Sequence, residues 1–367
     1  MFATIPSVGH SPDLPALRWK LETEEQPALF PDETAVERHL GTGEYRGMEF
    51  LHVNARSIIN SVPGASRMPF RYTINAYRGC SHACVYCFAR PTHKYLGLNI
   101  GRDFERRIVV KVNAVERLRA ELRAPTWGGD HIAMGTNTDP YQSAEGKYHL
   151  TRRIIEELAL AANPFSILTK STLVLRDLPI LVDASKRTRV RLDLSIGTLD
   201  EGVWRLTEPG TPPPKRRVEA VRRLNDAGIP CGVLVAPILP GLSDRDDQVS
   251  DVVAACLEAG AVSVSAVPLH LRPGVREHYL TWLRTVRPDL STTYERLFQR
   301  SAYQPAAEQA RLSRLVADAV TKSPGTTPTE RWLDIEAGTT NVAIRTRGWR
   351  PSARLDERDP SEQLRLL

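Results

Sequence analysis

The sequence predicts an α/β protein whose core is a partial (β/α)6 TIM-like barrel with an extension at each end. Two observations support this prediction. From Arg71 onward, short β-rich runs alternate with amphipathic helical stretches, which is typical of a mostly parallel sheet with helices outside it. The alternation repeats about every 35 to 40 residues, which is the size of one β/α unit.

Six strands and six helices follow from the pattern. The expected strands cover 72–77, 131–135, 165–169, 190–196, 232–237 and 262–267. The expected helices cover 112–123, 150–162, 173–186, 215–227, 244–259 and 275–285. Gly228 caps the end of the fourth helix, and Ser243 and Asp244 open the next one. Six units indicate a barrel that lacks the last two units of a full eight-stranded one, with a doubly wound open sheet as the alternative.

The chain divides into three expected parts. Residues 1–65 form a polar N-terminal extension with one helix at 31–40, residues 66–288 form the barrel, and residues 289–367 form a C-terminal extension with a helix at 306–321. Because an unpaired strand edge invites association, these extensions are candidates for covering the open edge of the barrel.

Composition excludes several classes of protein. With 367 residues, 41% hydrophobic and 25% charged, the chain is not mainly disordered. Its longest apolar runs, such as 232–239, fall short of the ~20 residues that span a bilayer, and its first residues lack a signal-peptide layout, so we expect a cytoplasmic protein. The net charge of +6 favours an anionic partner such as nucleic acid, although a solvated basic surface explains it as well.

The most specific motif is a C-x3-C-x2-C run, formed by Cys80, Cys84 and Cys87 directly after the first expected strand. Three thiolates within eight residues can hold a [4Fe-4S] cluster and leave one iron open to another ligand. Structural zinc requires four protein ligands, and His82 is too close to Cys80 to act comfortably as the fourth. Cys231 and Cys256 are expected to be buried small hydrophobes.

This run, with the aromatic Tyr86 before the third cysteine, resembles the signature of the radical S-adenosylmethionine (SAM) superfamily. The segments NAYRGCSHACVYCFARPTHKYLG, MGTNTDPYQ, LTKS, LSIGTLD and VLVAPILPGLSD resemble its DNA-repair-photolyase-like branch, which is related to spore photoproduct lyase. The likeness covers 71–283. It implies a partial (β/α)6 barrel of the radical SAM type, in agreement with the strand count.

The resemblance implies that Cys80, Cys84 and Cys87 hold the cluster and that the open iron chelates SAM. Reduction by an external donor such as a flavodoxin or ferredoxin then cleaves SAM to methionine and a 5′-deoxyadenosyl radical, which abstracts hydrogen from the substrate. The enzyme would be of the lyase or oxidoreductase type. The cofactor performs the difficult step, and the protein supplies position and excludes water.

Four polar residues at the ends of expected strands match SAM-contacting positions of the family. They are Thr136, Thr138, Lys170 and Ser195. A lysine at this place can neutralise the carboxylate of SAM. The alternatives are structural, because Thr-Asp-Pro is a common turn and a lysine can end a strand at the surface.

An apolar segment on the fifth expected strand resembles the part of the family that lies against adenine. Ala236 and Ile238 would make this contact, although core packing explains most of the segment. Asp139 and Asp193 flank the predicted site, and their spacing does not decide between a structural and a catalytic role.

The chain departs from spore photoproduct lyase at two positions. The lyase returns hydrogen from a cysteine whose place is taken here by Thr136, and an O–H bond is too strong for that role. Of two tyrosines near the cluster, Tyr86 is retained as the candidate catalytic residue, and Phe88 replaces the other. We therefore expect retained hydrogen abstraction on another substrate.

Nucleic acid is the leading substrate class, supported by basic segments at 215–223 and 345–350. Two other readings stay open. One is a radical SAM enzyme acting on a peptide or small metabolite, and the other is a non-enzymatic iron-sulfur or zinc-binding module.

Overall fold

A computed structural model describes residues 36–62 and 68–323, and two sheets form within this part of the chain. The larger has the strand order β11-β10-β9-β8-β7-β4-β3, and the smaller has the order β1-β2-β6-β5. The strands are β1 (Glu37–Leu40), β2 (Glu49–Val53), β3 (Ile59–Ser61), β4 (Tyr72–Ile74), β5 (Tyr77–Arg78), β6 (Arg107–Lys111), β7 (Ile132–Met134), β8 (Phe165–Thr169), β9 (Val190–Ser195), β10 (Cys231–Ile238) and β11 (Val264–Pro268).

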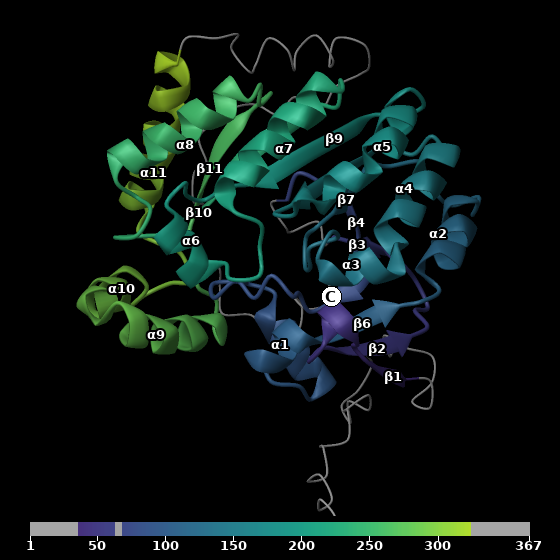
Figure 1. The fold of residues 1–367 in the computed structure, drawn as a ribbon, viewed down its shortest axis with the longest axis horizontal. Coiled ribbons are helices and arrows are strands. Elements are labelled where there is room, and N and C mark those ends of the chain that lie inside the picture. Colours follow the sequence, from purple (N-terminus) through teal and green to yellow (C-terminus); the bar gives the residue numbers. More distant parts are fainter. Residues whose placement is uncertain (1–35, 63–67, 324–367) are drawn as a thin grey trace, which may run out of the picture.

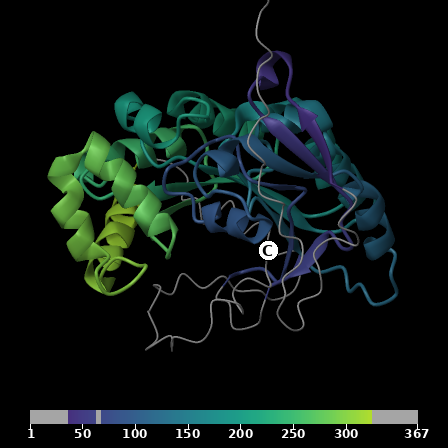
Figure 2. The same ribbon diagram turned by 90° about the horizontal axis from the view of Figure 1, so that it is seen from below.

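The described residues form the α-helices α1 (Arg102–Arg106), α2 (Ala114–Leu122), α3 (Ser143–Tyr148), α4 (Leu150–Leu160), α5 (Leu178–Ser185), α6 (Glu201–Thr207), α7 (Pro214–Asp226), α8 (Asp246–Glu258), α9 (Val275–Val286), α10 (Ser291–Leu297) and α11 (Ala306–Lys322). Helices α2, α4, α5, α7, α8 and α11 contribute to the main core and cover the outer face of the larger sheet (Figure 1). Helix α1 lies against β6 of the smaller sheet, and α9 and α10 lie on the opposite side of the molecule from β1 and β2 (Figure 2).

Strands β4, β7, β8, β9, β10 and β11 of the larger sheet run parallel to one another. These six strands are the six expected ones, and they confirm the partial (β/α)6 barrel. Because β4 and β11 end the parallel set without pairing to each other, the barrel is open. Nothing in the described helices is long and apolar enough to cross a bilayer.

Alternation along each strand separates the core from the barrel interior. On β8, Phe165 and Ile167 are fully buried beneath the helices, whereas Ser166 and Leu168 are half-buried on the inner side. On α4, Leu150, Ile154, Ile155 and Leu158 are buried at helical spacing against the same core. The main core therefore lies between the sheet and the helices, and the interior is left for a site.

Both ends of the open barrel are covered by the extensions. Strand β3 pairs antiparallel with β4, so the first edge is not free. Helix α11 packs against α8 and β11 on the other side. The expected tail helix at 306–321 is confirmed as α11, and Cys231 and Cys256 are confirmed as fully buried core residues.

Four local expectations need correction. The helix expected at 31–40 is wrong where the structure describes it, because Glu37–Leu40 is strand β1, paired with β2. The small sheet was missed, since short strands form through tertiary pairing that local pattern does not encode. The stretch 173–186 divides into a 3-10 turn and α5.

The fourth correction concerns the start of α8. This helix begins at Asp246, and Asp244 instead accepts a hydrogen bond from the backbone of Gly241 at 2.7 Å, closing the preceding turn. Gly228 does follow α7 as expected, with a φ of 81° that favours glycine.

Candidate functional site

The cysteine loop follows β5 at the carboxyl end of the barrel strands. Gly79 begins it with a φ of 84°, and a Cβ there would lie 2.9 Å from the carbonyl oxygen of Phe104. The backbone N–H of Cys80 donates to the same oxygen at 2.9 Å. Cys80 and Cys84 are buried, and Cys87 is half-buried.

Arg90 holds this loop together from beneath. Its side chain is fully buried and donates to the carbonyls of Cys84 (2.9 Å) and Ala83 (3.0 Å), where Ala83 has a φ of 56°. The guanidinium also pairs with Glu105 at 2.7 Å and lies over the Phe104 ring. One cation therefore satisfies carbonyls that no strand pairing reaches.

The three thiols fit a polynuclear cluster better than a single ion. All three are free, and burial raises the pKa of each, so thiolates here require a compensating metal charge. One zinc at ~2.3 Å from each sulfur would draw the Sγ atoms to within about 4 Å of one another. Among the described residues, one set of three potential metal ligands has its ligand atoms within 4.8 Å of one another, and it consists of Glu37, His39 and His52. The three Sγ atoms of the cysteine loop are therefore spaced more widely than a single zinc ion requires.

Lys170, Ser195 and Ala236 meet at the ends of three neighbouring strands. The Lys170 ammonium donates to the Ser195 hydroxyl at 2.6 Å and to the Ala236 carbonyl at 3.0 Å. It also lies 3.1 Å from a carboxylate oxygen of Glu208 and 5.6 Å from the Tyr86 ring centroid. Three predicted SAM contacts and the predicted catalytic tyrosine thus gather in one place.

Glu208 is the anion at the centre of this group. Its carboxylate accepts from Tyr86 and pairs with Arg217 at 2.5 Å. Burial opposes ionisation, but Arg217 and Lys170 outweigh it and lower the pKa of Glu208 to about 2. Burial and the adjacent Glu208 carboxylate raise the pKa of Tyr86, which therefore keeps its proton.

Thr138 and Thr136 lie in the loop after β7 and contact different residues. The Thr138 hydroxyl donates to the Gly79 carbonyl at 2.6 Å, and the Gln142 amide donates to the same carbonyl at 2.9 Å. Thr136 instead contacts the side chain of Asn75, with 3.2 Å between the Asn75 nitrogen and the hydroxyl. The two threonines therefore serve different partners in this structure.

Asp139 and Asp193, which flank the predicted site, both form polar contacts with neighbouring residues. Asp139 accepts from Thr169 at 2.6 Å and from the Lys170 backbone at 2.8 Å, and lies 3.3 Å from His82. Burial opposes its ionisation, but these partners lower the pKa of Asp139. Asp193 forms an ion pair with Arg191 at 2.8 Å. These contacts favour the structural role for both.

The two predicted adenine contacts point in different directions. Ala236 lies on the inner side beside Lys170, whereas the side chain of Ile238 is fully buried in the main core. The Ile238 contact stays a prediction that concerns its backbone. Phe88 is 38% exposed and lies beside His270.

Sequence reasoning missed Arg90, Glu208 and Arg217. The basic segment at 215–223 was interpreted as an exposed surface that supports nucleic-acid binding or faces solvent, but Arg217 is 1% exposed and donates to the Ser195 carbonyl at 3.0 Å. Its position on the buried side of α7, in step with Ala220, was the available signal. The second basic segment, 345–350, lies outside the described residues.

Sequence comparison finds related proteins across most of the chain. A model of the radical SAM superfamily matches residues 74–253. An uncharacterized protein of Mycobacterium tuberculosis is 43% identical over 285 residues, covering 78% of this chain and 84% of the relative. An uncharacterized protein of Methanocaldococcus jannaschii is 32% identical over 199 residues, covering 54% of this chain and 70% of the relative.

Solved structures of spore photoproduct lyase share the fold. A mutant of that enzyme superimposes with a TM-score of 0.55 at 18% identity, covering 74% of this chain and 78% of the lyase. The lyase complexed with dinucleoside spore photoproduct gives 0.54 at 18% identity with the same coverage. A mutant with bound AdoMet and the same dinucleoside gives 0.52 at 18% identity, covering 70% of this chain and 75% of the lyase.

Replacing the buried guanidinium tests the loop architecture. We expect Arg90→Met to lower the free energy of unfolding by about 3 kcal/mol, because it strips several buried carbonyls and Glu105 of their donor. Urea titration of the full chain measures this. Arg153→Met, at an exposed pair with Glu116, should change stability by about 0.5 kcal/mol or less. Equal losses in the two variants would contradict the role of Arg90.

Glu208 makes a pH-dependent contribution to stability. A carboxyl whose pKa is about 2 when folded and ~4.3 when unfolded stabilises the protein above the higher value, and this stabilisation is lost as pH falls toward 2. Glu208→Gln should therefore be less stable than the wild type at neutral pH, with a difference that shrinks below about pH 4. Urea midpoints at several pH values measure this, with exposed Glu219→Gln as the control. A constant difference contradicts it.

Proposed function

This chain belongs to the radical SAM superfamily, and we propose that Cys80, Cys84 and Cys87 bind a [4Fe-4S] cluster and that SAM binds beside it. The observation that carries the proposal is the set of three free thiols, two buried and one half-buried, at the carboxyl edge of a partial barrel. When bound, the cluster would supply the electron for reductive cleavage of SAM and so the 5′-deoxyadenosyl radical for hydrogen abstraction.

In this proposal the residues that meet at the strand ends, Lys170, Ser195 and Ala236, bind SAM. The ammonium would neutralise the carboxylate of SAM, the Ser195 hydroxyl would take a second polar atom, and Ala236 with the backbone of Ile238 would lie against adenine. Ser195 and Glu208 already hold the Lys170 ammonium in position, so its side chain loses little conformational freedom when SAM binds. Arg217 keeps Glu208 ionised while Lys170 serves the ligand.

The loop residues position the cluster in the same proposal. The Thr138 hydroxyl fixes the Gly79 carbonyl, directly before Cys80. Thr136, with its hydroxyl bonded to Asn75, would add to the polar lining of the SAM site. Tyr86 lies between the second and third cysteines, with its hydroxyl on Glu208. We assign Tyr86 as the catalytic residue beside the reacting atoms, and its buried ring also excludes water there.

We propose nucleic acid as the substrate class. The support is the net charge of +6 and the shared fold with spore photoproduct lyase, whose structure includes a dinucleoside spore photoproduct. Thr136 lacks the weak S–H bond that hydrogen return from this position requires, so the proposed reaction is hydrogen abstraction from a substrate other than spore photoproduct. An external electron donor such as a flavodoxin or ferredoxin is part of this proposal.

SAM cleavage is the direct test of the cofactor assignment. After anaerobic reconstitution, the wild type incubated with dithionite and SAM should form 5′-deoxyadenosine, and Cys84→Ala should lose at least about tenfold because a cluster ligand is gone. The matched control is Cys256→Ala, a buried cysteine in the core far from the loop. Equal formation in all three proteins, or one zinc and no iron per chain, would overturn the assignment.

Binding to single-stranded DNA tests the substrate class. The logarithm of the association constant should fall linearly with the logarithm of the salt concentration, with a slope of about −0.7 for each neutralised phosphate. Lys215 and Arg216 are exposed on α7 and pair with no carboxylate in the described residues, so the double change to alanine tests their contribution to the slope. Binding that is absent or insensitive to salt would exclude nucleic acid.

A further inference from the structure

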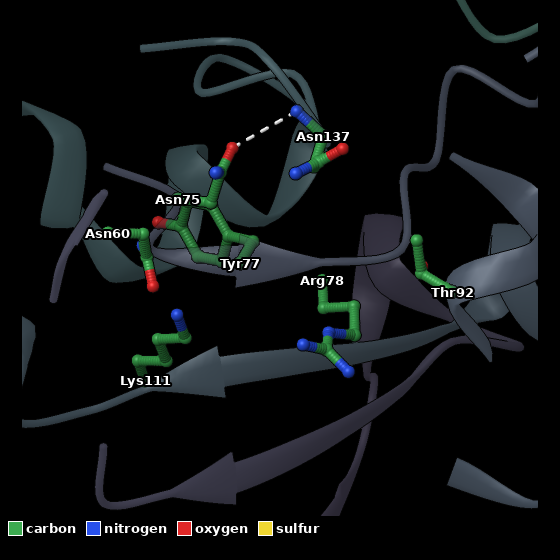
Figure 3. A pocket seen from close by; sticks show the side chains of 7 residues that line it. All are labelled: Asn60, Asn75, Tyr77, Arg78, Thr92, Lys111 and Asn137. Carbon is green, nitrogen blue, oxygen red and sulfur yellow. Dashed lines mark hydrogen bonds between the residues drawn. The ribbon is translucent and has the colours of Figure 1, made fainter. Parts of the chain in front are cut away.

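The two faces of the smaller sheet carry different polar groups, and one set suits a metal ion. On one face, Arg78 and Lys111 line a small cavity at the junction of the two sheets (Figure 3). Lys111 pairs in register with the residue that follows His52, so these two side chains lie on opposite faces. The cavity has two cationic side chains and does not suit a metal cation, whereas His52 lies beside Glu37 and His39.

Strand pairing brings these three potential ligands to one face. Glu37 and His39 are two positions apart on β1, so their side chains project from the same side of the strand. His52 of β2 is the register partner of Glu37 in an antiparallel pair, and directly opposite residues share a face. A carboxylate oxygen of Glu37 and one ring nitrogen of each histidine therefore lie within 4.8 Å of one another.

Two imidazoles and one carboxylate form a donor set that binds divalent transition metals. The same set, with water in the fourth position, holds zinc in catalytic sites. Around a tetrahedral zinc ion with bonds of ~2.0–2.1 Å, ligand atoms lie about 3.3 Å apart. Glu37 Oε2 and His39 Nε2 already lie 3.4 Å apart. The other separations have to shorten by about 1.5 Å at most, which rotation of the Glu37 and His39 side chains, 79% and 43% exposed, can supply.

A neighbouring residue holds the His52 ring in place. Its Nε2 lies 2.7 Å from the Tyr148 hydroxyl, and the ring stacks on that of His39 with 3.9 Å between centroids. Metal-binding histidines donate their second N–H to a nearby oxygen, which orients the ring. With a metal ion on Nδ1, His52 would donate its Nε2–H to Tyr148 in this way. Burial and the adjacent His39 lower the pKa of His52, so its neutral ring can act as a ligand at pH 7.

The charges beside these ligands leave the Glu37 carboxylate available. Lys147 is a nearby cation, and its ammonium lies over the rings of Phe50 and Tyr148, 4.9 Å and 5.4 Å from their centroids. In the described part of the chain, the Glu37 carboxylate lies within ion-pair distance only of His39. A lysine or arginine therefore does not neutralise it there, and a bound metal ion would supply that positive charge.

We propose that Glu37, His39 and His52 form a second metal site, which binds a divalent transition metal ion such as zinc separately from the cysteine loop. Among the described strands, β1 is an edge of the smaller sheet and pairs only with β2. An ion that joins both strands would stabilise this edge, because it binds the folded chain and not the unfolded one. Water would complete the coordination on the exposed side. The site is independent of the proposed function.

Zinc titration of the full chain tests the site, provided that the loop thiols are removed as a competing zinc site. In a variant whose three loop cysteines are replaced by serine, anaerobic calorimetry should show one zinc ion bound per chain. Adding His39→Ala or His52→Ala should weaken this binding at least about tenfold, because a ligand is lost. The matched control is His278→Ala on α9, on the opposite side of the molecule, which should leave the zinc affinity unchanged.

Two conservative variants test the geometry. Glu37→Gln keeps the size of the side chain but removes its charge, and Tyr148→Phe removes the hydroxyl that orients His52; each should weaken zinc binding about tenfold. Zinc should also raise the unfolding temperature of the thiol-free chain, and this shift should be lost with His39→Ala. Circular dichroism without zinc checks that each variant folds.

A cobalt titration keeps the test decisive if the thiol-free chain does not fold. In the wild-type chain, cobalt(II) bound by thiolates absorbs strongly in the near ultraviolet, whereas cobalt bound by histidine and carboxylate does not. The component without thiolate absorption should be lost in His39→Ala and kept in His278→Ala. Absence of zinc binding in the thiol-free chain, or metal binding that survives either His39→Ala or His52→Ala, would overturn the site.

Discussion

A loop that presents three thiols within eight residues cannot pair its carbonyls with a neighbouring strand, and a buried guanidinium takes the place of that pairing. Arg90 donates to Cys84 and Ala83 and balances its own charge on Glu105. The left-handed conformation of Ala83 persists because these contacts fix it. The contacts of Arg90 therefore fix the backbone that carries the thiols, and the rest of the site is arranged around that loop.

Charge balance connects this loop to the barrel. A single carboxylate, that of Glu208, contacts Tyr86 of the cysteine loop, Lys170 directly after β8 and Arg217 of α7. Two cations around one buried anion leave one positive charge to spare, and the spare charge lies at the ends of the strands. A cofactor with a carboxylate is suited to that position, whereas a neutral ligand would leave the excess charge unmatched.

Sequence patterns predicted the parts of this protein whose structure is encoded by neighbouring residues. Strand β8 is predicted to the residue because alternation and flanking turns agree, and the cysteine loop is recognisable because its spacing is local. The small sheet was missed because β2 and β6 pair across 58 positions, and strand β1 forms through its pairing with β2. The burial of Arg90 and Arg217 was missed because an arginine is expected at the surface until its buried partners are known.

The small sheet also orders events during synthesis. Strand β2 pairs with β6, joining Glu49 to Arg107 across 58 positions, and the cysteine loop lies inside that span. Strand β2 leaves the ribosome first but has no parallel partner until the cysteines have been made. Closing so long a segment costs chain entropy that only the completed contacts offset. All three cysteines are therefore synthesised before the small sheet that encloses their loop can close.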